Sequence, residues 1–219
     1  MTLDQVIATL KQHANPQNAQ GMARFGIRPA HALGIAIPKL RNLAREIGKN
    51  QSLALELWSS GIHEARILAS MIAEPHLFSP QQMEDWVKDF DSWDVCDQVC
   101  GNLFDKTPYA YQKALEWCHR EQEFVRRAGF VMMAELAVHD KQAVDEQFLP
   151  FFPLIKQYAV DERNFVKKAV NWALRQIGKR NSHLRALAVE CAKAINQIDS
   201  KVARWIAKDA LKELQETER

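Results

Sequence analysis

The stretch Phe124-Val125-Arg126-Arg127-Ala128 recurs 41 residues later as Phe165-Val166-Lys167-Lys168-Ala169, and Lys201-Val202-Ala203-Arg204-Trp205 is a looser third copy. A period near 40 residues is typical of arrays in which each unit is a pair of helices. One pair cannot bury its apolar faces alone, so the pairs stack on their neighbours. The repeat therefore predicts stacked antiparallel helix pairs.

The rest of the sequence also favours helices. Glycine and proline are scarce, at eight each in 219 residues, and the alternation typical of strands is hard to find. Helix starts are indicated at Ser79-Pro80-Gln81-Gln82 and at Thr107-Pro108, where a capping residue precedes proline. Other predicted helices cover residues 3–14, 38–47, 52–58 and 63–72. We expect an all-α fold, a HEAT-like α-solenoid (α-α superhelix) with a concave face, forming one domain over residues 1–219.

The composition is that of a globular protein, with 47% hydrophobic and 26% charged residues. No apolar run approaches the roughly 18 residues that a membrane span requires. The N-terminus shows no basic segment followed by an apolar one, so we expect no secretory signal. Four cysteines in a chain of this length do not suggest a disulfide framework. We therefore expect a cytoplasmic, monomeric protein with reduced thiols and no membrane partner.

The net charge of +2 conceals an asymmetry along the chain. Residues 163–212 contain twelve Lys and Arg against three Asp and Glu, whereas the remaining residues contain seventeen against twenty-four. Because this basic tract also has helical apolar periodicity, it indicates a folded surface that faces a polyanion. A basic face that is simply solvated is the alternative.

A helical stripe in residues 90–104 combines apolar residues with one carboxylate. Trp93 and Asp97 lie four residues apart and therefore on one helix face, which Cys96 and Cys100 adjoin. A carboxylate removed from water costs several kcal/mol unless a group pairs with it. Asp97 is therefore either a buried carboxylate paired with an arginine or with backbone N–H groups, or a functional one.

A second stripe combines a tryptophan with cations. Its members follow one another at spacings of four, three and four residues: Lys168, Trp172, Arg175 and Lys179. Lys167 and Arg180 flank it. Cations around an aromatic ring suit nucleic acid, which combines phosphates with stackable bases. The alternative places Trp172 in the core while the lysine stems lie along the apolar surface.

Arg126 and Arg127 open a helix whose remaining residues, 128–138, are mostly apolar. One of the two must point towards apolar surroundings, where it needs an anionic partner. That partner is either Asp97 or an external phosphate, which a guanidinium can bind through two hydrogen bonds.

Metal and cofactor sites are not indicated. Cys96 and Cys100 together with Cys118-His119 could be drawn as a zinc site, but no Cys-x-x-Cys pair exists, and cysteines on an apolar stripe usually belong to the core. Glycine-rich phosphate loops and His-Glu-x-x-His are also missing. We expect neither metal nor cofactor.

The chain resembles the AlkD-like DNA alkylation repair proteins, HEAT-like solenoids that include DNA glycosylases. Four blocks carry the resemblance, in the family's order: Leu33-Gly34-Ile35-Ala36-Ile37-Pro38-Lys39-Leu40-Arg41, Trp93-Asp94-Val95-Cys96-Asp97, Phe124-Val125-Arg126-Arg127-Ala128 and Lys168-Ala169-Val170-Asn171-Trp172-Ala173-Leu174-Arg175.

The resemblance implies a set of site residues. The family's Trp-x-x-x-Asp pair falls on Trp93 and Asp97, its active-site arginine on Arg127 and its second tryptophan on Trp172. An aromatic residue that is often tyrosine in the family falls on Phe25, through Met22-Ala23-Arg24-Phe25, so its hydroxyl is missing here. DNA contacts are expected from Phe25 and from the basic side chains Lys167, Lys168, Arg175, Lys179 and Arg180.

The resemblance also implies an activity, the excision of positively charged alkylpurines of the 3-methyladenine or 7-methylguanine type from double-stranded DNA. Two alternatives remain open. One is a non-catalytic protein that binds structured or branched DNA, and the other is a HEAT scaffold for a protein partner.

Overall fold

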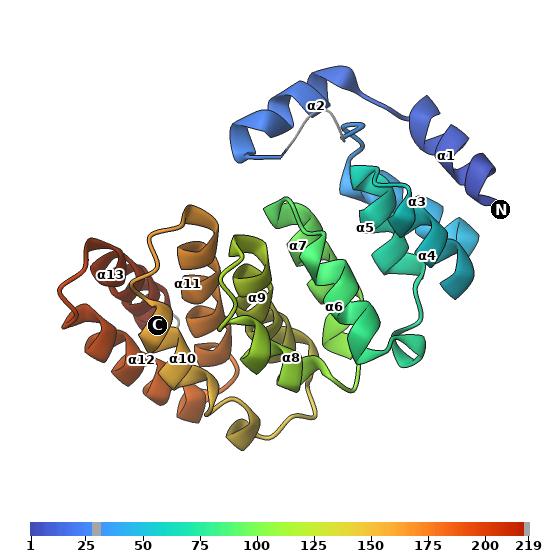
Figure 1. The fold of residues 1–219 in the computed structure, drawn as a ribbon. Coiled ribbons are helices and arrows are strands. Elements are labelled where there is room, and N and C mark those ends of the chain that lie inside the picture. Colours follow the sequence, from blue (N-terminus) through green and yellow to red (C-terminus); the bar gives the residue numbers. More distant parts are fainter. Residues whose placement is uncertain (28–31, 217–219) are drawn as a thin grey trace. The chain divides into compact units, whose positions relative to one another are not determined.

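The computed structural model describes residues 1–27 and 32–216, and every regular element in these ranges is a helix (Figure 1). The all-α prediction is thus confirmed. The chain divides into two compact units, Met1–Pro108 and Tyr109–Arg219. The single domain over residues 1–219 and its concave face stay predictions. None of the helices within the described ranges is long and apolar enough to cross a membrane.

Unit 1 contains seven α-helices and three short 3-10 helices within residues 1–27 and 32–108. The α-helices are α1 (Leu3–Gln12), α2 (Pro16–Met22), α3 (Ile37–Ile47), α4 (Gln51–Ser59), α5 (His63–Ile72), α6 (Pro80–Lys88) and α7 (Trp93–Asn102). The 3-10 helices are η1 (Ala23–Phe25), η3 (Pro75–Leu77) and η4 (Phe104–Lys106). Helix α5 packs against α3, α4 and α7, and therefore lies at the centre of the unit.

Unit 2 contains α8 (Ala110–Trp117), α9 (Glu123–His139), η5 (Asp145–Gln147), α10 (Phe151–Tyr158), α11 (Asn164–Gly178), α12 (Ser182–Asn196) and α13 (Lys201–Glu216). Consecutive helices pack as pairs, α8 with α9, α10 with α11 and α12 with α13, and the second helices pack side by side. The repeated stretches form the starts of α9 and α11, where the rings of Phe124 and Phe165 lie 5.5 Å apart. The predicted helix pairs are therefore present in this unit.

Local sequence signals account for several helix starts. The Ser79 side chain and Gln82 form the expected capping box at the start of α6, with Pro80 as the first helical residue. At Thr107-Pro108, however, the prediction is wrong, because α8 begins only at Ala110. The Thr107 hydroxyl donates instead to the carbonyl of Phe104, at 2.8 Å, and so closes the preceding turn.

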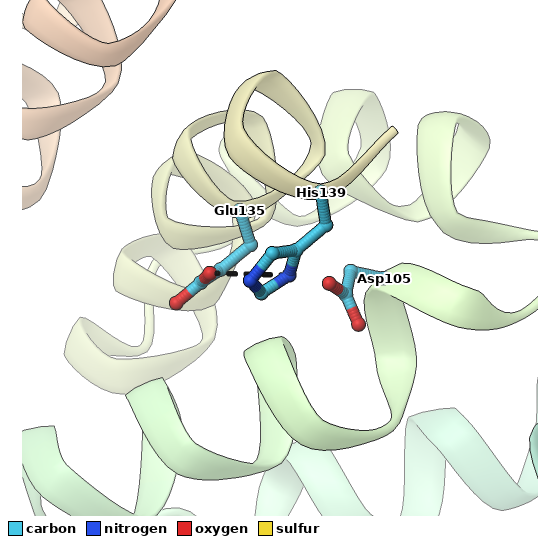
Figure 2. A group of neighbouring side chains, drawn as sticks. All are labelled: Asp105, Glu135 and His139. Atoms are coloured by element: carbon cyan, nitrogen blue, oxygen red, sulfur yellow. Dashed lines mark ion pairs between the residues drawn. The ribbon is translucent and has the colours of Figure 1, made fainter. Parts of the chain in front are cut away.

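The end of α9 carries a glutamate and a histidine in contact within the helix. Glu135 and His139 lie one turn apart, and the distance from His139 Nδ1 to Glu135 Oε2 is 3.5 Å (Figure 2). His139 lies in the last helical turn, where a positive charge is favoured by the helix dipole.

The segment Leu33–Ile35 is held by α5 and by the residues around α2. The buried carboxylate of Glu64 accepts hydrogen bonds from the backbone N–H groups of Leu33, Gly34 and Ile35, at 2.7, 2.6 and 3.2 Å. Gly34 has a φ of +74°, and a Cβ at this position would overlap the carbonyl oxygen of Asn15. Only glycine allows the chain to pass this close to the start of α2.

The cysteines confirm the expectation that they belong to the core. Cys96, Cys100 and Cys118 are buried, Cys191 is partly buried, and none of the four forms a disulfide. Cys96 and Cys100 lie on the inner face of α7, in a unit whose core also contains the stacked rings of Trp58 and Trp86, 3.9 Å apart.

Gly129→Ala is expected to lower the free energy of unfolding by about 3 kcal/mol, because α8 and α9 touch at this residue. An added Cβ would lie 2.5 Å from the backbone nitrogen of Cys118 and 3.1 Å from the carbonyl oxygen of Ala114. Backbone atoms cannot move aside without separating the helices. Urea denaturation measures the loss. The control is Gly21→Ala, which has open space around the new Cβ. Equal stability of the two variants would contradict the close packing of α8 on α9.

Candidate nucleic-acid interface

Trp93 and Asp97 lie on the partly exposed face of α7. Trp93 is the first residue of this helix and Asp97 follows one turn later, and both side chains are partly exposed. Cys96 and Cys100 are fully buried on the other side. The stripe predicted from the sequence therefore divides into a core edge and an outer edge. Asp97 is not a fully buried carboxylate.

Phe25 lies beside Trp93. The indole Nε1 of Trp93 donates a hydrogen bond of 3.0 Å to the backbone carbonyl of Phe25, which connects the start of α7 to η1. The Phe25 side chain is 63% exposed, although a large apolar ring would normally be covered. The structure thus brings together two of the predicted residues, and the aromatic ring of Phe25 is accessible to a ligand.

A partly buried ion pair between His63 and Asp94 lies at the N-terminal turn of α7. His63 Nε2, at the start of α5, lies 2.7 Å from Asp94 Oδ2, the residue after Trp93. Burial alone would lower the pKa of His63, but the hydrogen bond and the charge of Asp94 raise it above its ordinary value, with help from Glu64 and Asp91. The pair therefore anchors the helix end that carries Trp93 and Asp97.

The stability of the protein is expected to depend on the protonation of His63. The pKa of His63 is higher in the folded than in the unfolded chain. The contribution of protonated His63 to the free energy of unfolding is therefore complete below about pH 6.5, and it is lost as the pH rises through the folded-state pKa. We expect Asp94→Asn to lower the free energy of unfolding by about 2 kcal/mol at acidic pH, where His63 is protonated, and by less at alkaline pH. Urea denaturation from about pH 5.5 to about pH 9 measures this. Exposed Asp85→Asn is the control, and a difference between wild type and Asp94→Asn that does not change with pH would contradict the prediction.

Arg126 and Arg127 have different environments. Arg126 donates to Asp161, at 2.9 Å, and its guanidinium lies over the Tyr158 ring, 4.6 Å from the centroid. Arg127 is 6% exposed and donates a hydrogen bond of 2.6 Å to the carbonyl of Phe165 at the start of α11. Arg127 is therefore the arginine that points towards apolar surroundings. Its predicted anionic partner, Asp97 or a phosphate, stays a prediction.

The predicted stripe on α11 is present on one face of the helix. Lys168 is exposed and Trp172 is partly exposed, so the alternative of a fully buried tryptophan is wrong. Arg175 pairs with Glu213 of α13, and Lys179 Nζ lies 2.6 Å from the same carboxylate. Two of the cations expected to contact DNA are thus partly neutralised within the protein.

Arg175 and Lys179 lower the pKa of Glu213. Burial alone would raise the pKa of its carboxyl group, but the hydrogen bond from Lys179 and the charge of Arg175 hold it below its usual range. Glu213 therefore stays ionised near neutral pH and keeps both side chains aligned along α11. This carboxylate was not predicted from the sequence, because it lies on α13, two helices after α11 along the chain.

Lys167 and Arg180 flank the stripe as predicted, with separate contacts. Lys167 Nζ lies 5.7 Å from the ring centroid of Trp205 on α13. Arg180 donates to the carbonyl groups at the end of α9, those of Ala137, Asp140 and Ala143, at distances between 2.8 and 3.0 Å. Its guanidinium therefore ties the end of α9 and the loop after it to the end of α11, and the DNA contact of Arg180 stays a prediction.

The comparisons with known proteins agree with this architecture. The family model for "DNA alkylation repair enzyme" matches residues 6–214. The "Uncharacterized protein Lin0241" of Listeria innocua serovar 6a (strain ATCC BAA-680 / CLIP 11262) is 22% identical over 202 residues, which cover 90% of this chain and 88% of the relative.

A solved structure shares the fold. It is described as "A new family of proteins related to the HEAT-like repeat DNA glycosylases with affinity for branched DNA structures". It is 21% identical, with a TM-score of 0.84, and the match covers 99% of this chain and 95% of that one. The HEAT-like fold predicted from the repeat is confirmed. Because the family model spans almost the whole sequence, the chain belongs to the DNA alkylation repair enzyme family.

Proposed function

We propose that the protein is a monofunctional DNA glycosylase that removes positively charged alkylpurines, of the 3-methyladenine or 7-methylguanine type, from duplex DNA in base excision repair. The observation that carries the proposal is the partly exposed Asp97 carboxylate one turn from Trp93, in a chain of the DNA alkylation repair enzyme family. In this proposal the protein acts as a monomer in the cytoplasm.

The chemistry of the substrate explains why one carboxylate would suffice. An alkylpurine with a formal positive charge leaves as a neutral base, so no strong acid has to protonate it. As the bond between C1′ and N9 breaks, positive charge grows on the sugar. A carboxylate in a partly dry site stabilises that charge and orients the water that adds to C1′. The products are the free base and an abasic site, and neither a metal nor a cofactor is required.

Other residues would hold the substrate. Trp93 and Trp172 offer aromatic faces to the cationic nucleotide, and the accessible ring of Phe25 adds a third. Arg127 would hold a nearby phosphate, and Lys168 would contact the DNA backbone. Lys167, Arg175 and Lys179 contribute further positive charge along the same helix, although two of them share Glu213.

The test is the release of methylated base from duplex DNA. Purified protein is incubated with DNA that contains 7-methylguanine, and the free base is separated and quantified. We expect release that increases with protein concentration and leaves abasic sites in equal number. If the wild-type protein releases no base above the spontaneous rate, the proposal is wrong.

A second candidate is a protein that binds branched DNA without cutting a glycosidic bond. It is supported by the description of the solved structure with TM-score 0.84, whose family has affinity for branched DNA. Tight binding to a four-way junction without base release would favour this candidate. A HEAT scaffold for a protein partner is the remaining alternative, and DNA affinity that does not change with salt would favour it.

Lys168→Ala is expected to weaken DNA binding and to reduce the slope of log K against log salt by about one, because this exposed lysine faces solvent on the stripe. Fluorescence anisotropy with a labelled duplex at several salt concentrations measures the slope. Lys193→Ala is the matched control, since that lysine lies on α12 and pairs with Glu190 at 2.7 Å. The same slope for Lys168→Ala and wild type would remove Lys168 from the interface.

A further inference from the structure

The last helix of unit 2 repeats the residue pattern of the α11 stripe. The α11 stripe consists of Lys168, Trp172, Arg175 and Lys179, and what we name the α13 stripe consists of Lys201, Trp205, Lys208 and Lys212. Both have a tryptophan after four residues, then a cation after three, then a lysine after four. In both helices the same order of residue types therefore falls on one face.

The α13 stripe is narrow and faces away from the core. With 3.6 residues per turn, its four positions fall within an arc of roughly 60° and extend over roughly 16 Å of the helix. Its three lysines are exposed, and Trp205 is 42% exposed. The opposite face of α13 is fully buried and consists of Ala203, Ala207, Ala210 and Leu214.

The two stripes differ in whether their cations pair with carboxylates of the protein. On α11, Arg175 and Lys179 pair with Glu213. Asp209, the other acidic residue on the inner part of α13, accepts a hydrogen bond of 2.6 Å from Asn171. By contrast, the ammonium groups of the α13 stripe make no hydrogen bond or ion pair with the side chains described in ranges 1–27 and 32–215. Their positive charge is available to a ligand.

The Trp205 ring has a cation on one side and an exposed part that a ligand can reach. Lys167 Nζ lies 5.7 Å from its ring centroid, so one cation supports the indole from the α11 side while the exposed part of the ring remains accessible. The exposed part of this ring lies on the same helix face as Lys201, Lys208 and Lys212. It suits a ligand that presents flat apolar rings and negative charges in alternation.

We propose that the α13 stripe binds a single-stranded stretch of DNA, with an unpaired base stacked on Trp205 and its phosphates at Lys201, Lys208 and Lys212. Bases in a duplex are stacked on each other and offer no free face, whereas every unpaired base does. This inference goes beyond the proposed glycosylase activity and does not depend on it. Such a surface would hold a displaced strand or the open arm of a branched substrate.

The first test separates stacking from charge. Binding of a fluorescent oligothymidine to the full chain is measured by anisotropy for wild type, Trp205→Leu and Trp205→Tyr. We expect Trp205→Leu to weaken binding about tenfold, because loss of an aromatic platform removes base stacking, and Trp205→Tyr to retain most of it. For a duplex of the same length, Trp205→Leu should change the affinity less than twofold.

The second test concerns the lysines. The triple variant Lys201→Ala, Lys208→Ala and Lys212→Ala should reduce the salt slope for oligothymidine by about two, since each phosphate contact on a single strand contributes about 0.7. The matched control removes three exposed lysines from other helices and loops: Lys88→Ala, Lys141→Ala and Lys193→Ala. This control should leave the slope close to that of wild type.

Several outcomes would overturn the inference. These are a wild-type protein that does not bind oligothymidine, a Trp205→Leu variant that binds it as tightly as wild type, and an equal effect of the two triple variants. An equal loss of duplex and single-strand affinity in Trp205→Leu would also overturn it. Base release from methylated duplex is measured separately and should be unchanged in Trp205→Leu, so failure of the glycosylase proposal is distinguishable.

Discussion

Asp97→Asn is expected to lower the rate of base release by roughly 100- to 1000-fold, the loss typical when one preorganised electrostatic group is removed from a reacting centre. Asparagine has nearly the same shape as aspartate, so packing on α7 is retained, but its amide carries no negative charge. The charge that grows on the sugar is then no longer stabilised. Single-turnover release of 7-methylguanine from duplex DNA measures the effect on the chemical step.

DNA affinity and folding are the controls for the loss of base release in Asp97→Asn. Removal of a negative charge should leave duplex affinity equal to that of wild type or slightly tighter, and urea denaturation should show a folded protein. Asp85→Asn replaces an exposed aspartate on α6, which accepts a hydrogen bond from Gln81 at 2.8 Å, and should release base at the wild-type rate. Base release by Asp97→Asn at the wild-type rate would show that Asp97 has no part in the reaction.

Glu64→Ala is expected to lower the free energy of unfolding by about 4 kcal/mol. Glu64 is 1% exposed, and its carboxylate is the acceptor for three consecutive backbone N–H groups, those of Leu33, Gly34 and Ile35. Each buried donor left without an acceptor costs about 1 to 3 kcal/mol. Alanine also leaves a cavity between α5 and this segment. Urea denaturation measures the total loss.

Glu64→Gln refines this prediction. Its one amide oxygen can still accept, but its NH2 group would face a backbone donor, so we expect about half of the loss seen with alanine. Hydrogen exchange should accelerate at the three amides of Leu33–Ile35 in both variants. Glu56→Ala on α4 is the control, because Glu56 is exposed. Unchanged exchange at these amides in Glu64→Ala would contradict the role of Glu64 as their acceptor.

Helix positions could be predicted from the sequence to within two residues where a local signal exists. The helix predicted over residues 63–72 matches α5, and that over 52–58 is one residue longer at each end in α4. The repeat near 40 residues predicted the helix pairs, because both copies begin a helix at the same point. At Thr107 the same capping logic failed, because its hydroxyl had a nearer acceptor in Phe104.

Side-chain partners distant in the sequence could not be predicted. The mixed composition of the α7 stripe did indicate that Trp93 and Asp97 differ from their apolar neighbours, and their partial exposure agrees with this. One hydrogen-bond acceptor of Arg127 is the backbone carbonyl of Phe165, which no residue type reveals. Glu213 pairs with two cations 34 and 38 residues earlier, and only the packing of α13 on α11 makes this pairing evident.

The burial of the cysteines has a chemical consequence for a member of an alkylation repair family. Alkylating agents that modify purines also attack thiolates, which are the strongest nucleophiles among protein side chains. Burial raises the pKa of Cys118 to about 12 and that of Cys191 to about 11, so both remain protonated thiols at neutral pH. The thiols of Cys118 and Cys191 thus offer little reactive thiolate to alkylating reagents.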